Sequence, residues 1–285
     1  PTHYFLITFT VPKELHPFFI HKAKEGFTAV FKAASGALKE LAANPRFIGV
    51  DLPGFFGVLH TWGRTMDFHP HIHFVVPGGG IDREAGLWRS ATESFYVPGR
   101  ALAKVFKAKF RGLLRDAGLD ECTDPAAWTK NWVVDLQAVG QNREGILKYL
   151  APYVFKTAIT DNRIVSVDKG KVTFTYRKSG SNRQRRMTLA GSEFIRRYLM
   201  HVLPSGFMRI RHYGFMGSGC SIPQHELVAL VRMAHGFEVD AIEHAPAEKK
   251  PFLCPKCGGQ FIARYLIAAT GQIMVTFNIP VPRRE

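Results

Sequence analysis

The chain has 285 residues, 46% of them apolar and 21% charged, which is enough for one large domain or two ordinary ones and excludes a disordered or collagen-like chain. Thirty-eight Lys and Arg residues against 23 Asp and Glu residues give a formal net charge of +15, and this excess favours a polyanionic partner such as nucleic acid. No apolar run of 18 residues and no signal-peptide pattern occurs, so we expect a cytoplasmic protein without a membrane partner.

The first half of the chain alternates predicted strands and helices. Period-2 patterns predict strands over 3–11, 58–63, 71–76 and 132–139. Helical spacing of apolar residues predicts helices over 15–43, 102–118 and 144–157. The resulting order, β-α-β-β-α-β-α, fits an α+β fold with a ferredoxin-like split βαβ antiparallel sheet, helices packed on one side and one extra helix.

The pattern changes beyond about residue 165. Strands are expected over 172–177 and 207–214, and helices over 192–203 and 223–236. The stretch HAPAEKKP resembles a linker, and a hairpin around Thr270 and Gly271 follows it. We therefore predict an α+β core, a basic α/β extension and a small Cys-containing hairpin module, over residues 1–164, 165–243 and 244–285.

Positive charge is concentrated in one quarter of the chain. Residues 141–213 hold fifteen Lys or Arg and four Asp or Glu, a net charge of +11. Clustered cations suit phosphate contacts, whereas the alternative is a solvated basic loop. On the strand FMRIRHY, alternation would place Arg209 and Arg211 beside Phe207 and Tyr213, where bases could stack. The other candidate nucleic-acid-binding residues here are Arg177, Lys178, Arg183, Arg185 and Arg186.

The string HPHIH holds the first chemical constellation. On a strand, His71 and His73 point to one face while Ile72 and Phe74 pack on the other. This geometry suits a metal ion, although a chain with twelve histidines contains an H-x-H by chance about half the time. The alternative is a pair of surface histidines whose hydrogen bonds are satisfied without a metal. His60 on the preceding strand supplies a third ligand if the register brings it to the same face. Three protein ligands with open positions are typical of a catalytic metal.

Two tyrosines form the second constellation, in KYLAPYVFK. On a helix, Tyr149 and Tyr153 lie four residues apart on one face, so two phenols could address one centre in turn. Core or surface tyrosines are the alternative. A phenol with a pKa of about 10 is a poor nucleophile at neutral pH unless cations favour its phenolate. The flanking Lys148 and Lys156 are cations of this kind.

A metal strand, a tyrosine helix and a basic stretch follow one another in a mechanistically coherent order. The chain resembles the HUH-type two-tyrosine transposases of rolling-circle insertion sequences, the ISCR elements among them, almost from end to end. The strings that carry the resemblance are LHTWG, HPHIHFVVPGGG, KYLAPYV, EFIRRYLMHVLPSGFMRIRHYGF and CPKCGG.

The resemblance implies an HUH nuclease core and a bacterial, nucleoid-associated single-stranded DNA endonuclease and strand transferase acting at transposon ends and target. His71 and His73 would hold a divalent cation, Mg²⁺ or Mn²⁺, with His60 as third ligand and Gln137 as its rival. Imidazole ligands also accept manganese, zinc or nickel, so the ligands alone leave the ion open.

By the same resemblance, Tyr149 or Tyr153 would attack the scissile phosphate, giving a 5′-phosphotyrosine and a free 3′-hydroxyl. Two tyrosines permit two coupled transesterifications. No Walker motif is present, so strand separation is expected to come from elsewhere, for example host replication machinery. The oligomeric state is left open by the sequence.

The sequence departs from the family pattern in two respects. Pro152 stands between the tyrosines, where an interior proline bends a helix or costs about 3 kcal/mol. Family members usually begin with a cysteine-rich zinc-binding segment, and the start at Pro1 leads us to expect a truncated chain.

Four further residues are candidates for a structural zinc site, with a reduced, metal-free CxxC as the alternative. They are Cys254, Cys257, Cys220 and His225.

Two other functions compete with a transposase. A histidine-triad nucleotide hydrolase or transferase also fits HPHIHFV, but the paired tyrosines, the basic segment and the length argue against it. A single-stranded DNA-binding protein without catalysis would use the basic stretch and the aromatics alone.

Overall fold

The computed structural model divides into two units, Pro1–Val239 and Asp240–Glu285, and each is described by itself. It describes residues 2–139, 158–177, 180–181 and 183–236, and the backbone of strands 261–267 and 273–280. The predicted helix over 144–157 and the predicted linker lie outside these residues, and the predicted three-way domain division stays a prediction. None of the helices in the described part of the chain has the length and apolar composition that crossing a bilayer requires.

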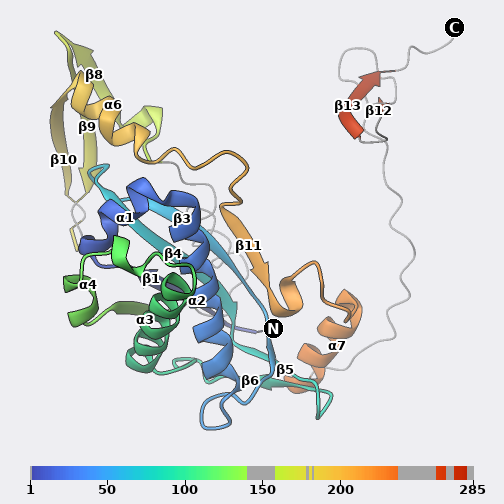
Figure 1. Cartoon of the computed structure of the whole chain (residues 1–285). Coiled ribbons are helices and arrows are strands. Elements are labelled where there is room, and N and C mark those ends of the chain that lie inside the picture. Colours follow the sequence, from blue (N-terminus) through green and yellow to red (C-terminus); the bar gives the residue numbers. More distant parts are fainter. Residues whose placement is uncertain are drawn as a thin grey trace, which may run out of the picture. The chain divides into compact units, whose positions relative to one another are not determined.

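A five-stranded antiparallel sheet forms the centre of the first unit (Figure 1), in the order β11-β3-β4-β1-β7. Its strands are β1 Tyr4–Thr10, β3 Phe55–Trp62, β4 Phe68–Pro77, β7 Val133–Ala138 and β11 Ile210–Tyr213. Four of them, in the order β3-β4-β1-β7, have the arrangement of a split βαβ fold, to which β11 adds an edge. The α+β class and the antiparallel sheet are confirmed.

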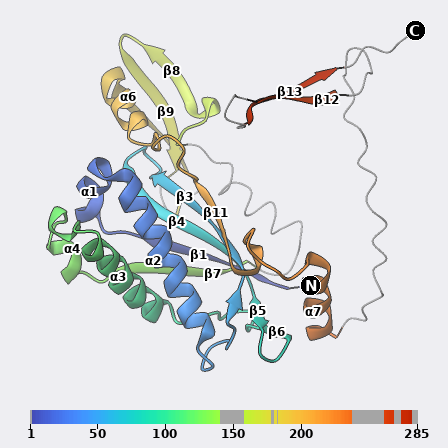
Figure 2. The same cartoon turned by 45° about the vertical axis from the view of Figure 1, so that its right-hand side comes forward.

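Helices cover one face of this sheet, as Figures 1 and 2 show. They are α1 His16–His21, α2 Ala23–Ala43, α3 Gly99–Asp116 and the short α4 Ala126–Thr129. In α3 the buried residues Leu102, Phe106, Phe110 and Leu114 recur every fourth position, which gives the helix one apolar face. Together with α2 and the sheet they form one core, in which Phe9 of β1 packs edge-on against Phe106.

The long helix predicted over 15–43 is broken at Lys22, whose φ of −127° and ψ of 50° are not helical. The break lets α1 fold against α2, so that Phe19 stacks on Phe27 and Phe110. A β-carbon on Gly26 would lie 2.8 Å from Phe19, so this close approach needs glycine. Apolar spacing alone could not locate the break, because α1 and α2 both bury phenylalanines.

The remaining elements complete the first unit and the second. A small sheet in the order β10-β9-β8 has the strands β8 Ile164–Asp168, β9 Lys171–Arg177 and β10 Gln184–Ala190. A second small sheet has β2 Leu52–Pro53, β5 Gly79–Asp82 and β6 Leu87–Ser90. Helices α6 Gly191–Leu199 and α7 Gln224–Ala234 follow. In the second unit, β12 Phe261–Ile267 pairs with β13 Ile273–Pro280, which confirms the final hairpin.

The central sheet has two chemically different faces because side chains alternate along each strand. On β4, Ile72 and Phe74 point toward the helices and are fully buried. His71 and His73 therefore point to the opposite face, which carries no helix in the described part of the chain; we call it the open face.

Candidate metal centre

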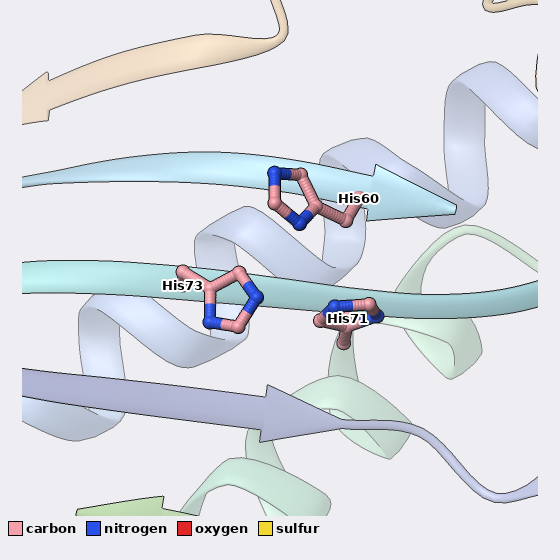
Figure 3. Close-up of side chains that lie close together, drawn as sticks. All are labelled: His60, His71 and His73. Atoms are coloured by element: carbon pink, nitrogen blue, oxygen red, sulfur yellow. The ribbon is translucent and has the colours of Figure 1, made fainter. Parts of the chain in front are cut away.

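Three imidazoles gather on the open face (Figure 3). His60 of β3 stands directly opposite His71 of β4 in the antiparallel register, and His73 is two positions further along β4. One ligand nitrogen from each ring lies within 4.8 Å of those of the other two. Two nitrogens bound to one ion at about 2.1 Å each can be at most roughly 4 Å apart, so small ring rotations bring all three to one cation.

Burial and hydrogen bonds orient these rings. His60 and His73 are buried, whereas His71 is half-buried. Nδ1–H of His71 donates to the carbonyl of His69 at 2.7 Å, which leaves Nε2 as the ligand atom of the neutral ring. Nδ1 of His73 lies 2.9 Å from the hydroxyl of Thr8 on β1. Such outer partners fix the tautomer and direction of metal-binding histidines, so the donor set fits a divalent cation.

The register separates the two candidates for a third ligand. His60 faces His71 across the β3–β4 pair. Gln137 of β7 stands opposite Leu6, and its amide donates to Asp135 at 2.6 Å. His60 thus belongs to the histidine cluster, whereas Gln137 lines the cavity beside the cluster.

A cavity of about 670 Å³ opens beside the three histidines. The main sheet lines it with the histidines, Thr8, Asp135 and Gln137, and the small sheet lines it with Thr175, Tyr176, Arg177 and Gln184. Arg64 and Arg163 add two guanidinium groups to its wall. A metal site with an adjoining basic cavity can hold a phosphate group beside the cation.

The turn between β3 and β4 is held by side chains from much later in the chain. Three consecutive backbone carbonyls of this turn each accept a hydrogen bond. Nη2 of Arg163 donates to the carbonyl of Arg64 at 2.8 Å, and Nη1 of Arg197 donates to that of Thr65 at 3.1 Å. Nε2 of His201 donates to the carbonyl of Met66 at 3.2 Å. We call these three donors the turn clamp.

The clamp supports a turn whose backbone is unusual. Met66 is fully buried and has a φ of +62°, a left-handed conformation that non-glycine residues rarely adopt. Burial lowers the pKa of His201, which keeps that ring neutral. Its Nδ1 lies 3.3 Å from the hydroxyl of Thr61, the residue that follows His60. The clamp therefore fixes the two strands that carry the histidines.

Replacing Arg197 by Ala should lower the free energy of unfolding by about 1–2 kcal/mol, because a half-buried carbonyl loses a charged donor. Arg196→Ala is the matched control. Both arginines contact Glu193 and hold its pKa at about 2, but only Arg197 reaches the turn. Urea unfolding of both variants measures the difference, and equal midpoints would contradict the clamp.

The structure distributes the predicted nucleic-acid-binding arginines over several surfaces. Arg177 lines the cavity, and Arg185 and Arg186 lie in β10. The strand predicted around FMRIRHY is β11, but Arg211 lies over the rings of Phe31 and Phe207, 4.5 Å and 4.9 Å from their centroids. The guanidinium of Arg211, which was expected to meet phosphates while bases stacked beside Phe207 and Tyr213, thus packs against rings of the protein itself.

Other predicted site residues are placed as follows. Arg209 lies over the ring of Trp62, and Arg183 is exposed before β10. The thiol of Cys220 lies 3.8 Å from the carbonyl of Ile222, and His225 is exposed in the first turn of α7. Seven predicted residues lie outside the described part of the chain: Tyr149, Tyr153, Lys148, Lys156, Lys178, Cys254 and Cys257.

Several residues around the centre escaped the sequence analysis. Thr8 and Asp135 belong to strands whose pattern predicts only alternation. Arg197 and His201 stand four positions apart, a spacing that places two side chains on one helix face. Nothing in the sequence indicates that they donate hydrogen bonds to the turn between β3 and β4.

The protein has an α+β fold with a cluster of three histidines, able to hold a cation, on its open sheet face. The family model described as "Y2_Tnp: Putative transposase" matches residues 54–223, which include the three histidines and the turn clamp. The chain belongs to this transposase family.

Two curated relatives resemble most of the chain. "Putative transposase y4qJ" of Sinorhizobium fredii (strain NBRC 101917 / NGR234) is 34% identical over 87% of this chain and 66% of its own length. "Transposase for insertion sequence element IS801" of Pseudomonas savastanoi pv. phaseolicola is 27% identical over 96% of this chain and 70% of its own length. The chain thus spans about two thirds of each relative. No solved structure matches it.

Proposed function

We propose that the chain is a single-stranded DNA endonuclease and strand transferase of the HUH two-tyrosine type, acting in rolling-circle transposition of an insertion sequence. The observation that carries the proposal is the cluster of His60, His71 and His73 on the open sheet face beside a basic cavity. Family membership favours a transposase over a histidine-triad hydrolase. The name of one relative, a transposase for an insertion sequence element, supports the same assignment.

The three histidines would hold Mg²⁺ or Mn²⁺. When bound, such a cation supplies Lewis-acid polarisation of a phosphate oxygen. The chain's own contribution is to keep the ligand nitrogens aimed at one point, through the carbonyl of His69 and the hydroxyl of Thr8. The arginines of the cavity wall favour a phosphate there by their charge.

Tyr149 and Tyr153 are the proposed nucleophiles. The phenol oxygen forms a bond to phosphorus and loses its proton, while the bond from phosphorus to the 3′-oxygen breaks and that oxygen takes up a proton. The products are a 5′-phosphotyrosine and a free 3′-hydroxyl. The phosphotyrosine preserves the energy of the broken bond, so joining to another strand needs no nucleotide cofactor.

The proposed partners are single-stranded DNA at the transposon ends and at the target, with host replication machinery as the source of strand separation. The basic extension would contact the DNA, as the excess of Lys and Arg in 141–213 favours. A structural Zn²⁺ bound by the CxxC motif stays a prediction.

A covalent-adduct assay tests the function. Labelled single-stranded DNA with Mn²⁺ should give a protein–DNA adduct on a denaturing gel, and the Tyr149→Phe/Tyr153→Phe variant should give none. Tyr176→Phe is the matched control, because this phenol also lines the cavity and its loss should leave the adduct intact.

Each alternative gives another pattern. An adduct that persists in the double variant, or that only Tyr176→Phe removes, would overturn the tyrosine assignment. Adenylate hydrolysis without metal would indicate histidine-triad chemistry. Salt-sensitive binding without any adduct would indicate a DNA-binding protein without catalysis.

A further inference from the structure

The small sheet has one face that is packed and one that is not. On β9, Val172 and Phe174 are buried. Phe174 meets Phe194 of α6 with ring centroids 5.9 Å apart, and the guanidinium of Arg163 lies over the Phe174 ring, 5.9 Å from its centroid. Helix α6 therefore covers this face.

The opposite face is polar and basic. Alternation and register place Arg177 opposite Gln184, Thr175 opposite Arg186, and Thr173 opposite Thr188. We call this the threonine–arginine face, defined by Thr173, Thr175, Arg177, Gln184, Arg186 and Thr188.

The side chains of this face offer hydrogen-bond donors and positive charge. Its residues on β10 are exposed, as is Arg177. The hydroxyls of Thr173 and Thr188 bond across the strands at 2.8 Å, which aligns the two strands. The one carboxylate on strands β8–β10 is Asp168, which stands opposite Lys171 at the end remote from Arg177.

The threonine–arginine face is continuous with the metal centre. Its members Thr175, Arg177 and Gln184 line the same cavity as His71 and His73. Nη1 of Arg64, another cavity residue, donates to the carbonyl of Arg177 at 3.3 Å. Cationic side chains thus follow one another from the cavity wall to Arg186.

We propose that the threonine–arginine face binds the phosphodiester backbone of one DNA strand as it leaves the metal centre. The proposal rests on the proposed function, since that function places a single strand in the cavity. Arg186 and Arg177 are diagonal neighbours, about 7–8 Å apart at the backbone, a spacing that suits successive phosphates of an extended strand. Threonine hydroxyls donate to phosphate oxygens between them.

The sequence groups Arg185 with Arg186 as a candidate for nucleic-acid binding, but the strand register separates the two residues, so Arg185 supplies a matched control. It is exposed like Arg186 and directly precedes it, but it stands opposite Tyr176 and therefore on the other face of the sheet. Removing either arginine changes the net charge equally. Only Arg186→Gln should remove a phosphate contact.

Fluorescence anisotropy with a labelled single-stranded oligonucleotide in EDTA, at several salt concentrations, tests the proposal. Arg186→Gln should reduce the slope of log K against log salt by about 0.7, and Arg177→Gln/Arg186→Gln by about twice that, while Arg185→Gln keeps the wild-type slope. Thermal unfolding by circular dichroism checks that the exposed substitutions leave the fold intact.

The outcomes separate this proposal from the proposed function. Equal slopes for Arg185→Gln and Arg186→Gln would overturn the threonine–arginine face, even if adducts form. An equal effect of Arg186→Gln on a duplex of the same sequence would overturn the assignment to one strand. Different slopes without any adduct would support the face and contradict cleavage.

Discussion

A His71→Ala/His73→Ala variant should bind Mn²⁺ more than about 100-fold more weakly than the parent chain. Loss of an outer hydrogen-bond partner alone costs 10–100-fold in comparable sites, and here two ligands are removed from a cluster of three. Isothermal titration calorimetry with Mn²⁺ measures the change. The adduct described above should disappear with the metal affinity.

His69→Ala is the control for this experiment. His69 stands on the same strand, and its ring centroid is 5.2 Å from that of His71, but it lies outside the cluster of ligand nitrogens. Its backbone carbonyl, which accepts the bond from His71, survives the substitution. Mn²⁺ affinity that falls in His69→Ala as far as in the double variant would contradict the assigned ligand set.

Phe74→Ala should lower the free energy of unfolding by about 3–5 kcal/mol, because a fully buried ring is removed from a packed core. The ring meets Phe9 and Phe55 at centroid distances of 5.2 Å and 4.9 Å. It also lies so close to Gly57 that a β-carbon there would be 2.3 Å away. Urea unfolding measures the loss.

Phe74→Leu keeps much of the side-chain volume and should cost less than half as much as Phe74→Ala. Under conditions where each variant is folded, Mn²⁺ affinity should stay near the parent value, since the histidines lie on the opposite sheet face. A loss below about 1 kcal/mol in Phe74→Ala would contradict a tightly packed core at this position.

The alternation on β4 could be predicted from the sequence because its period is local. It separates His71 and His73 from Ile72 and Phe74 without knowledge of any other strand. The place of His60 depended on the pairing of two strands, and therefore on the turn between them. Its left-handed Met66 and its distant donors carry no local pattern, so the register became known only from the structure.

In the basic stretch, the sequence predicts the charge of the surface but not which sheet face each arginine occupies. Its arginines predict a phosphate-binding surface, but their side chains leave the sheet on two faces because Arg185 and Arg186 are consecutive strand residues. Charge clustering in the sequence cannot separate the two faces. Similarly, Arg211 alternates as predicted, yet β11 joins the edge of the main sheet and turns this guanidinium toward Phe31.

The turn clamp also determines when, during synthesis, the turn between β3 and β4 can gain all its hydrogen-bond donors. Its donors follow the carbonyls that they hold by 99, 132 and 135 positions. At about 5–20 residues per second, a ribosome finishes the turn on the order of ten seconds before it adds His201. A nascent chain that has not reached His201 lacks at least one donor of the turn clamp, and it also lacks strand β11. Completion of the cation site is thereby coupled to synthesis of the segment that we propose contacts DNA.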